Sequence, residues 1–372
     1  MSNIDTLLQA KEYIERPERS VRNKWQDLPD ELILKILSYS EVIDLIVCGQ
    51  VSKRTRNISR DNSLWVMATF KEKIVKTELL ELILSKGCKI LNISDSTIAG
   101  SLSSTIKSQL RVLNLSQSAV GFLEPGPVYH YEETLYVLEQ LLFSCCSLQR
   151  LEMKGFCITS KMTDSICKNG KTLQALHLNH SFVYDPTNSY HFKWYRLDNT
   201  VPKGCLQTII KSCRELREVD LSCINSQEGG LRVVGLKLLA KNITPKIEKL
   251  NLTNHHFIDD QVKILLSRCN KIKTLSLNAY IITDDSLTYI RDYLNHTLEE
   301  LSLENVDDGN YISFTAILKL KSMPRLKFLN LNLVKKDDCE EIQNFRLHMP
   351  HIKIQGFPRT LPVSTVFNFF NF

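Results

Sequence analysis

The stretch KIEKLNLTNHHFIDDQVKILLSRCNKIKTLSL, residues 246–277, contains one full period of the pattern that decides the fold of this chain. It opens with Ile247, Leu250 and Leu252 in the spacing L-x-x-L-x-L, and the same motif returns at its end. Alternation over the last residues of the motif predicts a short strand with its leucines on one face. Residues 261–269, QVKILLSRC, have the apolar spacing of a helix. The period therefore combines one strand with one helix.

The motif recurs along most of the chain, and several successive copies lie about 25–28 residues apart. Clear copies begin at Gln109, Ser147, Thr172, Glu215, Lys246, Lys271, Thr297 and Arg325, and degenerate copies begin at Cys88 and His351. This interval is typical of leucine-rich repeats, in which no unit buries its apolar face alone and neighbours stack. We therefore predict an α/β solenoid, a curved parallel sheet with helices on its outer face.

Side chains that flank the inward leucines are expected to line the open, concave face of this sheet. They are Arg150, Glu152, Lys154, His177, Asn179, Asp220, Lys249, Asn251, Ser276, Asn278, Glu300, Glu304, Asn330 and Asn332. The set is polar, basic in the N-terminal copies and acidic toward Glu300. Arg150, Lys154 and Lys249 are candidates for phosphate recognition. Including His177 and Asn251, these five residues are our predicted substrate contacts within the repeats.

Aspartate pairs fall where helices of the repeats are expected to begin: Asp259–Asp260, Asp284–Asp285, Asp307–Asp308 and Asp337–Asp338. A carboxylate in the first turn accepts free N–H groups and is favoured by the helix dipole. Ca²⁺ binding is the alternative, but recurrence in step with the repeat favours capping. His255, His256 and Asp259 come nearest to a metal triad, and we predict no metal site there.

The eleven cysteines are spread through apolar patterns without a disulfide-like framework, which predicts reduced thiols. Cys213 and Cys269, with Cys145 or Cys146, fall at one phase of the repeat just before the strand. A solenoid spaces equivalent positions along its axis, whereas a metal requires ligands that converge. These thiols are therefore predicted to be buried packing groups. Sequons at Asn92, Asn114 and Asn251 lie inside predicted strands, and we interpret them as a by-product of the repeat.

Two repeats are longer than the others, through the insertions GFLEPGPVYHYEE (121–133) and FVYDPTNSYHFKWYRLDNTVPKG (182–204). Insertions in repeat arrays map to loops on one side, often a binding side. The second insertion contains Trp194 and Arg196, residue types that dominate interface hot spots. Two interpretations stay open: substrate contact by these side chains, or an ordinary excursion that packs Trp194 against the flank of the solenoid.

Ahead of the repeats, residues 25–65 have a different pattern. Leu28-Pro29 is predicted to open a helix with Asp30 and Glu31 in its first turn. An apolar stripe follows at Leu32, Ile33, Ile36 and Leu37, a second series at Val47, Val51 and Ile58, and a third at Leu64, Trp65 and Ala68. A three-helix unit of about forty residues has more apolar faces than it can bury on itself. The apolar surface left over predicts that this unit binds a partner.

The segment LPDELILKIL, the V-S-K-R step at 51–54 and D-x-S-L-W at 61–65 resemble an F-box, although Thr55 stands where F-boxes of this type carry Trp. Followed by such repeats, the segment is similar to the F-box/LRR family of SCF (cullin–RING) ubiquitin ligases. The resemblance implies an adaptor subunit that connects the chain to cullin and RING subunits. The residues it assigns to adaptor binding are Leu28, Pro29, Leu32, Ile33, Ile36 and Trp65.

The resemblance also implies that the solenoid holds a phosphorylated cell-cycle protein for ubiquitination, with a small phosphate-binding accessory subunit as a further partner. The expected organisation is a flexible segment at 1–22, the F-box at 23–70, the solenoid at 71–357 and a phenylalanine-rich tail at 358–372. The alternative is a leucine-rich-repeat scaffold outside any ligase, with the F-box-like segment serving as a cap.

Composition and motifs exclude several other classes of function. No nucleophile–base pair emerges, so we predict no catalytic residue, no cofactor and a non-enzymatic chain. The net charge of +6 is not concentrated in a basic tract, which argues against nucleic-acid binding. No run approaches 18 apolar residues, so no membrane span is predicted. The charged N-terminus lacks the apolar core of a signal peptide, and we expect the protein in the nucleus or cytoplasm.

Overall fold

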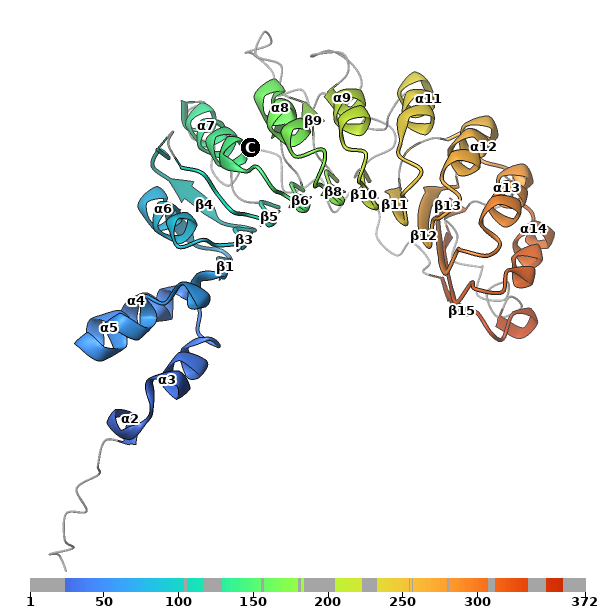
Figure 1. Cartoon of the computed structure of the whole chain (residues 1–372). Helices are drawn as coiled ribbons and strands as arrows, with labels where there is room; N and C mark the ends of the chain where they lie inside the picture. The colour runs from blue at the N-terminus through green and yellow to red at the C-terminus, as the bar shows by residue number, and fades with distance from the viewer. Residues whose placement is uncertain are drawn as a thin grey trace, which may run out of the picture. The chain divides into compact units, whose positions relative to one another are not determined.

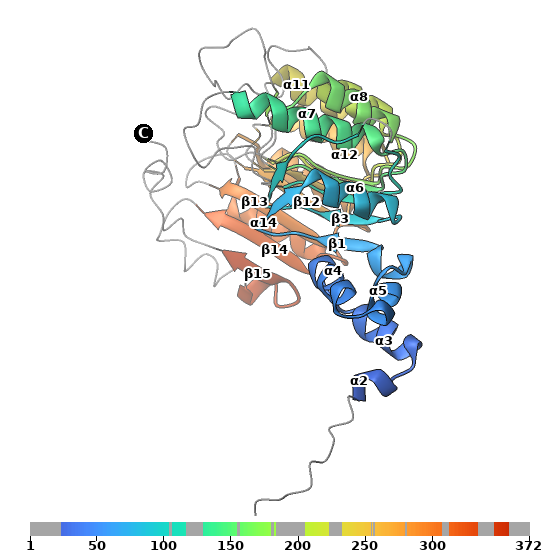
Figure 2. The same cartoon turned by 90° about the vertical axis from the view of Figure 1, so that its left-hand side faces the viewer.

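The computed structural model describes residues 24–103, 106–116, 129–154, 157–179, 182–183, 205–222, 233–253, 255, 257–279, 281–306, 312–333 and 346–356. The chain divides into two compact units, Met1–Val66 and Met67–Phe372. The first unit is helical. The second contains the repeats, and Figures 1 and 2 show its layers from two sides.

The first unit consists of α2 (Lys24–Asp27), α3 (Asp30–Leu37), α4 (Val42–Val51), α5 (Lys53–Ser59) and the 3₁₀ turn η1 (Asn62–Trp65). Pro29 precedes α3 as its N-cap, with φ −55° and ψ 151°, so the helix begins one residue later than predicted. The predicted series through Val51 and Ile58 is divided between α4 and α5. The division falls at Ser52, whose extended backbone, φ −154° and ψ 163°, ends one helix and caps the next.

Thr55, the departure from the F-box pattern, has a structural role of its own. It is buried, and its backbone N–H donates to Ser52 Oγ over 3.1 Å. In return the backbone N–H of Ser52 donates to Thr55 Oγ1, also over 3.1 Å. This capping box satisfies two N–H groups at the start of α5. Threonine therefore supplies a cap where an aromatic side chain would supply packing, and such caps contribute about 0.5–2 kcal/mol.

Two polar contacts fasten the helices of the first unit to one another. Arg54 Nε donates to Asp30 Oδ1 over 2.7 Å, and Arg54 Nη2 donates to the carbonyl of Leu28, which ties α5 to the start of α3. The indole N–H of the buried Trp65 donates to the carbonyl of Ser59 over 2.8 Å. The apolar core of the described part of this unit is made by Ile33, Leu37, Val42, Leu45, Ile58, Leu64 and Trp65.

The second unit is built on a parallel sheet of described strands in the order β1-β3-β5-β6-β8-β10-β11-β12-β13-β14-β15. Their bounds are β1 (Met67–Thr69), β3 (Ile90–Asn92), β5 (Val112–Asn114), β6 (Arg150–Glu152), β8 (Ala175–His177), β10 (Glu218–Asp220), β11 (Lys249–Leu252), β12 (Thr274–Asn278), β13 (Glu300–Val306), β14 (Phe328–Leu333) and β15 (Lys353–Gly356). Every predicted copy of the repeat supplies one of these strands, the two degenerate copies included. β1 was not predicted: Ala68 pairs with Leu91 of β3 and does not continue a helix.

In Figure 1 the helices of this unit lie on the outer side of the arc that its strands follow. They are α6 (Thr77–Ser85), α7 (Tyr129–Ser144), α8 (Ser160–Lys168), α9 (Cys205–Ser212), α11 (Val233–Asn242), α12 (Asp259–Arg268), α13 (Asp284–Leu294) and α14 (Phe314–Lys319), the last continued by η2 (Leu320–Ser322). Small parallel pairs join β2 (Ile74–Lys76) to β4 (Thr97–Ala99) and β7 (Cys157–Ile158) to β9 (Phe182–Val183). The predicted α/β solenoid is confirmed. Within the described residues, no helix has the length and apolar content needed to cross a bilayer.

The long insertions fall mostly outside the described residues. Of the first, residues 129–133 open α7, and of the second, Phe182 and Val183 form β9. Trp194 and Arg196, two of the predicted substrate contacts, lie outside the described residues, as does the predicted tail at 358–372.

The core lies between the sheet and the helices. From β3 to β15, the second residue of each strand of this sheet faces the core, and none of these side chains is more than 5% exposed. They are Leu91, Leu113, Leu151, Leu176, Val219, Leu250, Leu275, Leu301, Leu329 and Ile354. Burial of a side chain of this size contributes about 1.5–3 kcal/mol. Because these side chains lie at matching positions of neighbouring strands, stacking of the repeats contributes to stability.

The first-turn aspartates bind the next helix rather than their own. Asp259, the first residue of α12, accepts from the backbone N–H and the hydroxyl of Thr283, each over 2.9 Å. Asp284, the first residue of α13, accepts from the backbone N–H and the hydroxyl of Ser313, over 2.6 and 2.7 Å. Thr283 and Ser313 are the N-caps of α13 and α14. We call these two contacts the cap links.

The cap links correct the prediction that each aspartate caps its own helix. The position in the first turn is as predicted, but stacking brings successive helix starts close enough for a carboxylate to reach the following cap. The N-cap hydroxyls of Thr283 and Ser313 accept from the N–H groups of their own helices. The predicted pairs at 307–308 and 337–338 lie outside the described residues.

The cysteines of the repeat are buried thiols, as predicted. Cys88, Cys145, Cys213 and Cys269 are 0% exposed and not disulfide-bonded. The structure resolves the alternative between neighbours: Cys145 occupies the repeat position and Cys146 is exposed. Burial raises the pKa of the Cys145 thiol to about 11 and the pKa of Cys213 and Cys269 to about 12. These groups therefore stay protonated near neutral pH, which makes them poor nucleophiles and poor metal ligands.

Candidate functional site

The first unit exposes an apolar stripe on α3. Leu32 is 51% exposed and Ile36 is 45% exposed, one helical turn apart on the same face. Ile33 and Leu37, one position further along in each case, are buried in the core. The helix is therefore apolar on both sides, and one side has no intramolecular cover among the described residues. Exposed apolar stripes of this kind mark protein-interaction sites.

A second exposed stripe runs along α4. Ile43, Val47 and Val51 follow one another at intervals of four residues and are all exposed, with Val51 at 74%. Val42 and Leu45 face the core. The sequence placed Val47 and Val51 in an apolar series without assigning them to the outer face. Their spacing from Ile43 was the signal, since residues four apart share one face of a helix.

The six residues predicted to bind an adaptor are not equivalent in the structure. Leu32 and Ile36 lie on the outer stripe of α3, and Pro29 is exposed as the N-cap. Leu28 is half-buried, with its carbonyl bound by Arg54. Ile33 and Trp65 are fully inside the unit. These two hold in place the helices that display the others, and a direct contact by either would require the unit to open.

The second candidate surface is the concave face of the sheet. Strand register places Arg150, Ala175, Glu218 and Lys249 in one row across β6, β8, β10 and β11. Glu152, His177, Asp220 and Asn251 form the next row across the same strands. Neighbouring strands lie about 4.8 Å apart. Four of the predicted substrate contacts, Arg150, His177, Lys249 and Asn251, thus come together on adjacent strands.

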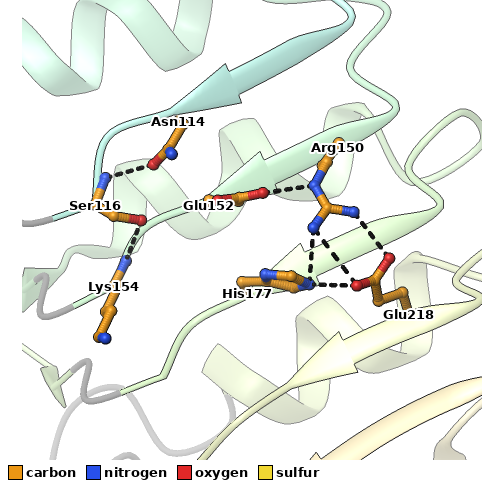
Figure 3. Close-up of polar contacts among 7 residues, drawn as sticks. All are labelled: Asn114, Ser116, Arg150, Glu152, Lys154, His177 and Glu218. Atoms are coloured by element: carbon orange, nitrogen blue, oxygen red, sulfur yellow. Dashed lines mark hydrogen bonds and ion pairs between the residues drawn. The ribbon is translucent and has the colours of Figure 1, made fainter. Parts of the chain in front are cut away.

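Arg150 spans two strand spacings within its row, as Figure 3 shows. Its Nη1 donates to Glu218 Oε2 over 2.8 Å and its Nε to Glu152 Oε1 over 2.5 Å. The residue between Arg150 and Glu218 in the row is Ala175, whose small side chain leaves room for the guanidinium group to cross. His177 Nε2 lies 3.1 Å from Glu218 Oε1. Arg150 is therefore bound by two carboxylates on its own surface.

This pairing sets the protonation of the cluster. Burial by itself would raise the pKa of Glu218, but the hydrogen bond from Arg150 and the charges of Arg150, His177 and Lys249 outweigh burial and lower it. Burial would likewise lower the pKa of Arg150, and the bonds to Glu152 and Glu218 raise it instead. Both groups stay ionised around neutral pH. Carboxylates thus occupy N–H donors of Arg150 that a phosphate would have to share, and a phosphate contact by Arg150 stays a prediction.

The remaining predicted contacts also have local roles. Asn251 Oδ1 accepts from the backbone N–H of Thr253 over 3.1 Å and so turns the chain at the end of β11. Asn92, Asn114 and Asp220 make the same bond to the residue two positions on. The Asn-x-Ser/Thr triplets are thus a signature of this turn. Lys154 follows β6, where its backbone N–H donates to Ser116 Oγ over 3.4 Å (Figure 3).

A row of alternating charge precedes the strands from β10 to β14. Its members, which we call the charge ladder, are Arg217, Glu248, Lys273, Glu299 and Lys327. Glu248 binds Arg217 over 2.7 Å and Lys273 over 2.6 Å, and Glu299 binds Lys327 over 2.7 Å. Hydrogen bonds from Lys273 and Arg217 lower the pKa of Glu248, and one from Lys327 lowers the pKa of Glu299. Each carboxylate of the ladder thus has a cation of its own.

Of the three residues nearest to a metal triad, the two that the structure describes have other partners. His255 is buried, and its Nε2 lies 2.6 Å from the carbonyl of Leu221. Asp259 is engaged in a cap link, and His256 lies outside the described residues. Across the described part of the chain, no three His, Cys, Asp or Glu side chains are grouped so as to hold a metal ion.

The first unit is similar to a known protein family. Residues 25–71 match the F-box-like family. The chain combines an F-box-like domain with a leucine-rich-repeat-like solenoid. Among solved structures, the crystal structure of a TLR13–ssRNA13 complex is similar, with a TM-score of 0.37 and 16% sequence identity over 80% of this chain. The alignment spans 43% of the TLR13 chain.

Proposed function

We propose that this chain is the substrate-recognition subunit of an SCF (cullin–RING) ubiquitin ligase. The observation that carries the proposal is the F-box-like match at residues 25–71, which falls on a unit with exposed apolar stripes on α3 and α4. F-box domains serve as docking modules for the adaptor subunit. Leu32 and Ile36 are the adaptor contacts that the exposed surface favours, with Ile43, Val47 and Val51 as additions.

The role assigned to the chain is one of proximity rather than chemistry. Bound through the adaptor to cullin and RING subunits, the solenoid would hold a protein substrate near a charged ubiquitin-conjugating enzyme. Holding two reactants in one complex raises their effective concentration by orders of magnitude. No catalytic side chain is needed for this, and we assign none.

A finer proposal rests on the resemblance alone. The order of W-x-x-LPDEL, the spacing to SLW, the repeat run and the closing MPHIKI are similar to the S-phase kinase-associated F-box protein. From this we propose a phosphorylated cell-cycle substrate, a small phosphate-binding accessory subunit, and a place in the nucleus or cytoplasm. Since Arg150 is bound by Glu152 and Glu218, phosphate reading is assigned to the accessory subunit. Affinity capture with and without phosphatase tests this, and partners indifferent to phosphatase would refute it.

The adaptor proposal is tested by co-expression of the full chain with the SCF adaptor subunit. We expect a soluble one-to-one complex, and at least a hundredfold weaker binding for the double variant Leu32→Asp with Ile36→Asp. Asn57→Asp, an exposed change on α5, introduces the same side chain at a position that belongs to neither stripe and serves as the control. Circular dichroism checks that the variants fold. Undiminished binding by the double variant would reject the adaptor contact and favour the non-ligase scaffold.

A further inference from the structure

We infer that the concave face between β6 and β13 binds a basic segment of the substrate, one that presents Lys or Arg side chains. The inference rests on the proposed function, because it names the chemistry of the protein that the receptor would hold. Its basis is the sign and the pairing of the charges that the strands bring to this face.

The concave rows carry a charge opposite to that of the whole chain. In the two rows defined above, the carboxylates from β6 to β13 are Glu152, Glu218, Asp220 and Glu300, and the cations are Arg150 and Lys249. Four carboxylates against two cations leave these rows acidic, although the chain as a whole has a formal charge of +6. A face of this sign attracts basic partners and repels phosphorylated ones at the stage of encounter.

Both cations of the face are already committed to one end of it. Arg150 binds Glu152 and Glu218, and Lys249 lies next to Glu218 in the same row. Toward β13, the carboxylates Asp220 and Glu300 have no ion pair with a cation among the described residues. Among the described residues, the contacts of Asp220 are the backbone N–H and hydroxyl of Ser222, and the contact of Glu300 is the hydroxyl of Thr274 over 3.3 Å. These are neutral donors, which leave the negative charge of the carboxylates uncompensated.

In the charge ladder, by contrast, the negative charge of each carboxylate is neutralised by a neighbouring cation. One position earlier along the same strands, Glu248 has two cations within 2.7 Å and Glu299 has one at 2.7 Å. The chain thus pairs the carboxylates of the charge ladder with cations, whereas Asp220 and Glu300 on the open face have only neutral donors among the described residues. A bound basic segment would supply the missing cations.

Strand spacing defines the segment further. Asp220 lies on β10 and Glu300 on β13, three strands away, which is about 14 Å across the sheet. An extended peptide advances about 3.3 Å per residue. Basic side chains about four residues apart in an extended segment that crosses the strands would therefore meet both carboxylates. Partly buried carboxylates, such as Glu152 and Glu218 at 23% and 26% exposure, surround the Asp220 end.

The test uses a fluorescein-labelled Gly-Ser peptide with arginines four residues apart, titrated with the purified full chain and followed by anisotropy. We expect saturable binding that weakens at least tenfold between 50 and 300 mM NaCl, because exposed charges are screened over about 10 Å at 0.1 M salt. Matched peptides with glutamate or phosphoserine in place of arginine are expected not to bind. Stronger binding of the phosphoserine peptide would overturn the inference in favour of a phosphate-reading face.

The double variant Asp220→Asn with Glu300→Gln locates the contact. Asparagine already makes the strand-end turn at Asn92, Asn114 and Asn251, so the change at 220 removes charge and preserves the turn. We expect at least tenfold weaker binding of the arginine peptide. Glu248→Gln with Glu299→Gln removes the same charge from the charge ladder and is expected to change binding by less than twofold.

Equal losses in the two double variants would show attraction by overall charge and would reject the site. The assay contains no adaptor subunit. A chain that binds the arginine peptide through Asp220 and Glu300 but fails to bind the adaptor would leave this surface standing and remove the ligase role. The reverse result would retain the ligase role and remove the surface.

Discussion

The stripes on α3 and α4 and the rows on the concave sheet make different demands on a partner. On the helical unit, Leu32, Ile36 and Val51 offer apolar area that is stabilising wherever water is excluded from it. On the sheet, Asp220 and Glu300 offer charge, which rewards a matching cation and penalises an anion. Apolar interfaces are typical of lasting association, and charged faces discriminate between ligands and respond to salt. The chain thus has one surface suited to a constant partner and one suited to selection.

The largest expected effect is the unfolding of the helical unit by Ile33→Asp, with the solenoid left intact. Leu32→Asp is the comparison. Ile33 is fully buried, and an unpaired carboxylate there costs several kcal/mol, enough to unfold a unit of this size. Leu32 is half exposed, so the same aspartate is tolerated by the fold. Hydrogen exchange read by mass spectrometry should show loss of protection over α3 to α5 for Ile33→Asp alone, with α6 to α14 unchanged. Similar loss in both variants would contradict the division of α3 into an inner and an outer face.

Gly170→Ala is expected to weaken the solenoid and spare the helical unit. A Cβ at Gly170 would lie 2.5 Å from the carbonyl oxygen of Ser212, so the turns that follow α8 and α9 are forced apart. Overpacking of this kind costs about 1–3 kcal/mol. The urea midpoint of the solenoid should fall, while Lys171→Ala, an exposed neighbour, stays within about 0.5 kcal/mol of the parent chain. An unchanged midpoint for Gly170→Ala would show that the repeats are not held at this contact.

Asp259→Asn tests the first cap link and is expected to have a smaller effect on stability than the two preceding substitutions. The carboxylate accepts from the backbone N–H and hydroxyl of Thr283, and hydrogen bonds to a charged group contribute about 1.5–3 kcal/mol. Asparagine retains one acceptor oxygen, so the expected loss is about 1–2 kcal/mol. Hydrogen exchange should quicken at the start of α13. Asp260→Asn, on the exposed neighbour, provides the control, and an equal effect there would assign the loss to the dipole of α12.

The smallest effect is expected from acid titration of the charge ladder. Lys273 and Arg217 lower the pKa of Glu248 below its ordinary value of 4.5, so its contribution to stability is complete above that pH and disappears as the pH falls through the lowered pKa. Exposed pairs contribute at most about 1 kcal/mol. Glu248→Gln should therefore be slightly less stable than the parent chain at pH 7 and equal to it in strong acid. A difference that persists at pH 2 would assign the effect to packing.

Much of the solenoid follows from local spacing. Leucines at i, i+3 and i+5 specify a strand and its buried face, and each predicted copy forms a strand in the sheet. β1 was not predicted because Met67, Ala68 and Thr69 lack the L-x-x-L-x-L motif. Their exposed–buried–exposed alternation is too short to identify a strand without the pairing to β3. The cap links were misassigned for a related reason, since a first-turn aspartate does not reveal which helix start lies closest to it.

The candidate surfaces were predictable only in part. An apolar run such as Leu32-Ile33 predicts a buried helix face without showing which of the two neighbours faces inward. Arg150 is a basic residue on the concave face, as predicted, but its bond to Glu218 joins residues 68 positions apart. That contact depends on the register of β6, β8 and β10 and on the small side chain of Ala175. The net charge of such a face depends on which side chains form ion pairs across the sheet. Local sequence does not show those pairs.

The cap links give the solenoid a direction. Asp259 holds the start of α13, and Asp284 holds the start of α14, so support passes from each helix to the one that follows it. Removal of α14 would leave α13 with its own cap and its support intact. Removal of α12 would take from Thr283 the carboxylate that positions it. Shortening this end of the array from its C-terminal side should therefore be tolerated better than a break within it, and an opening at α12 should spread toward the C-terminus.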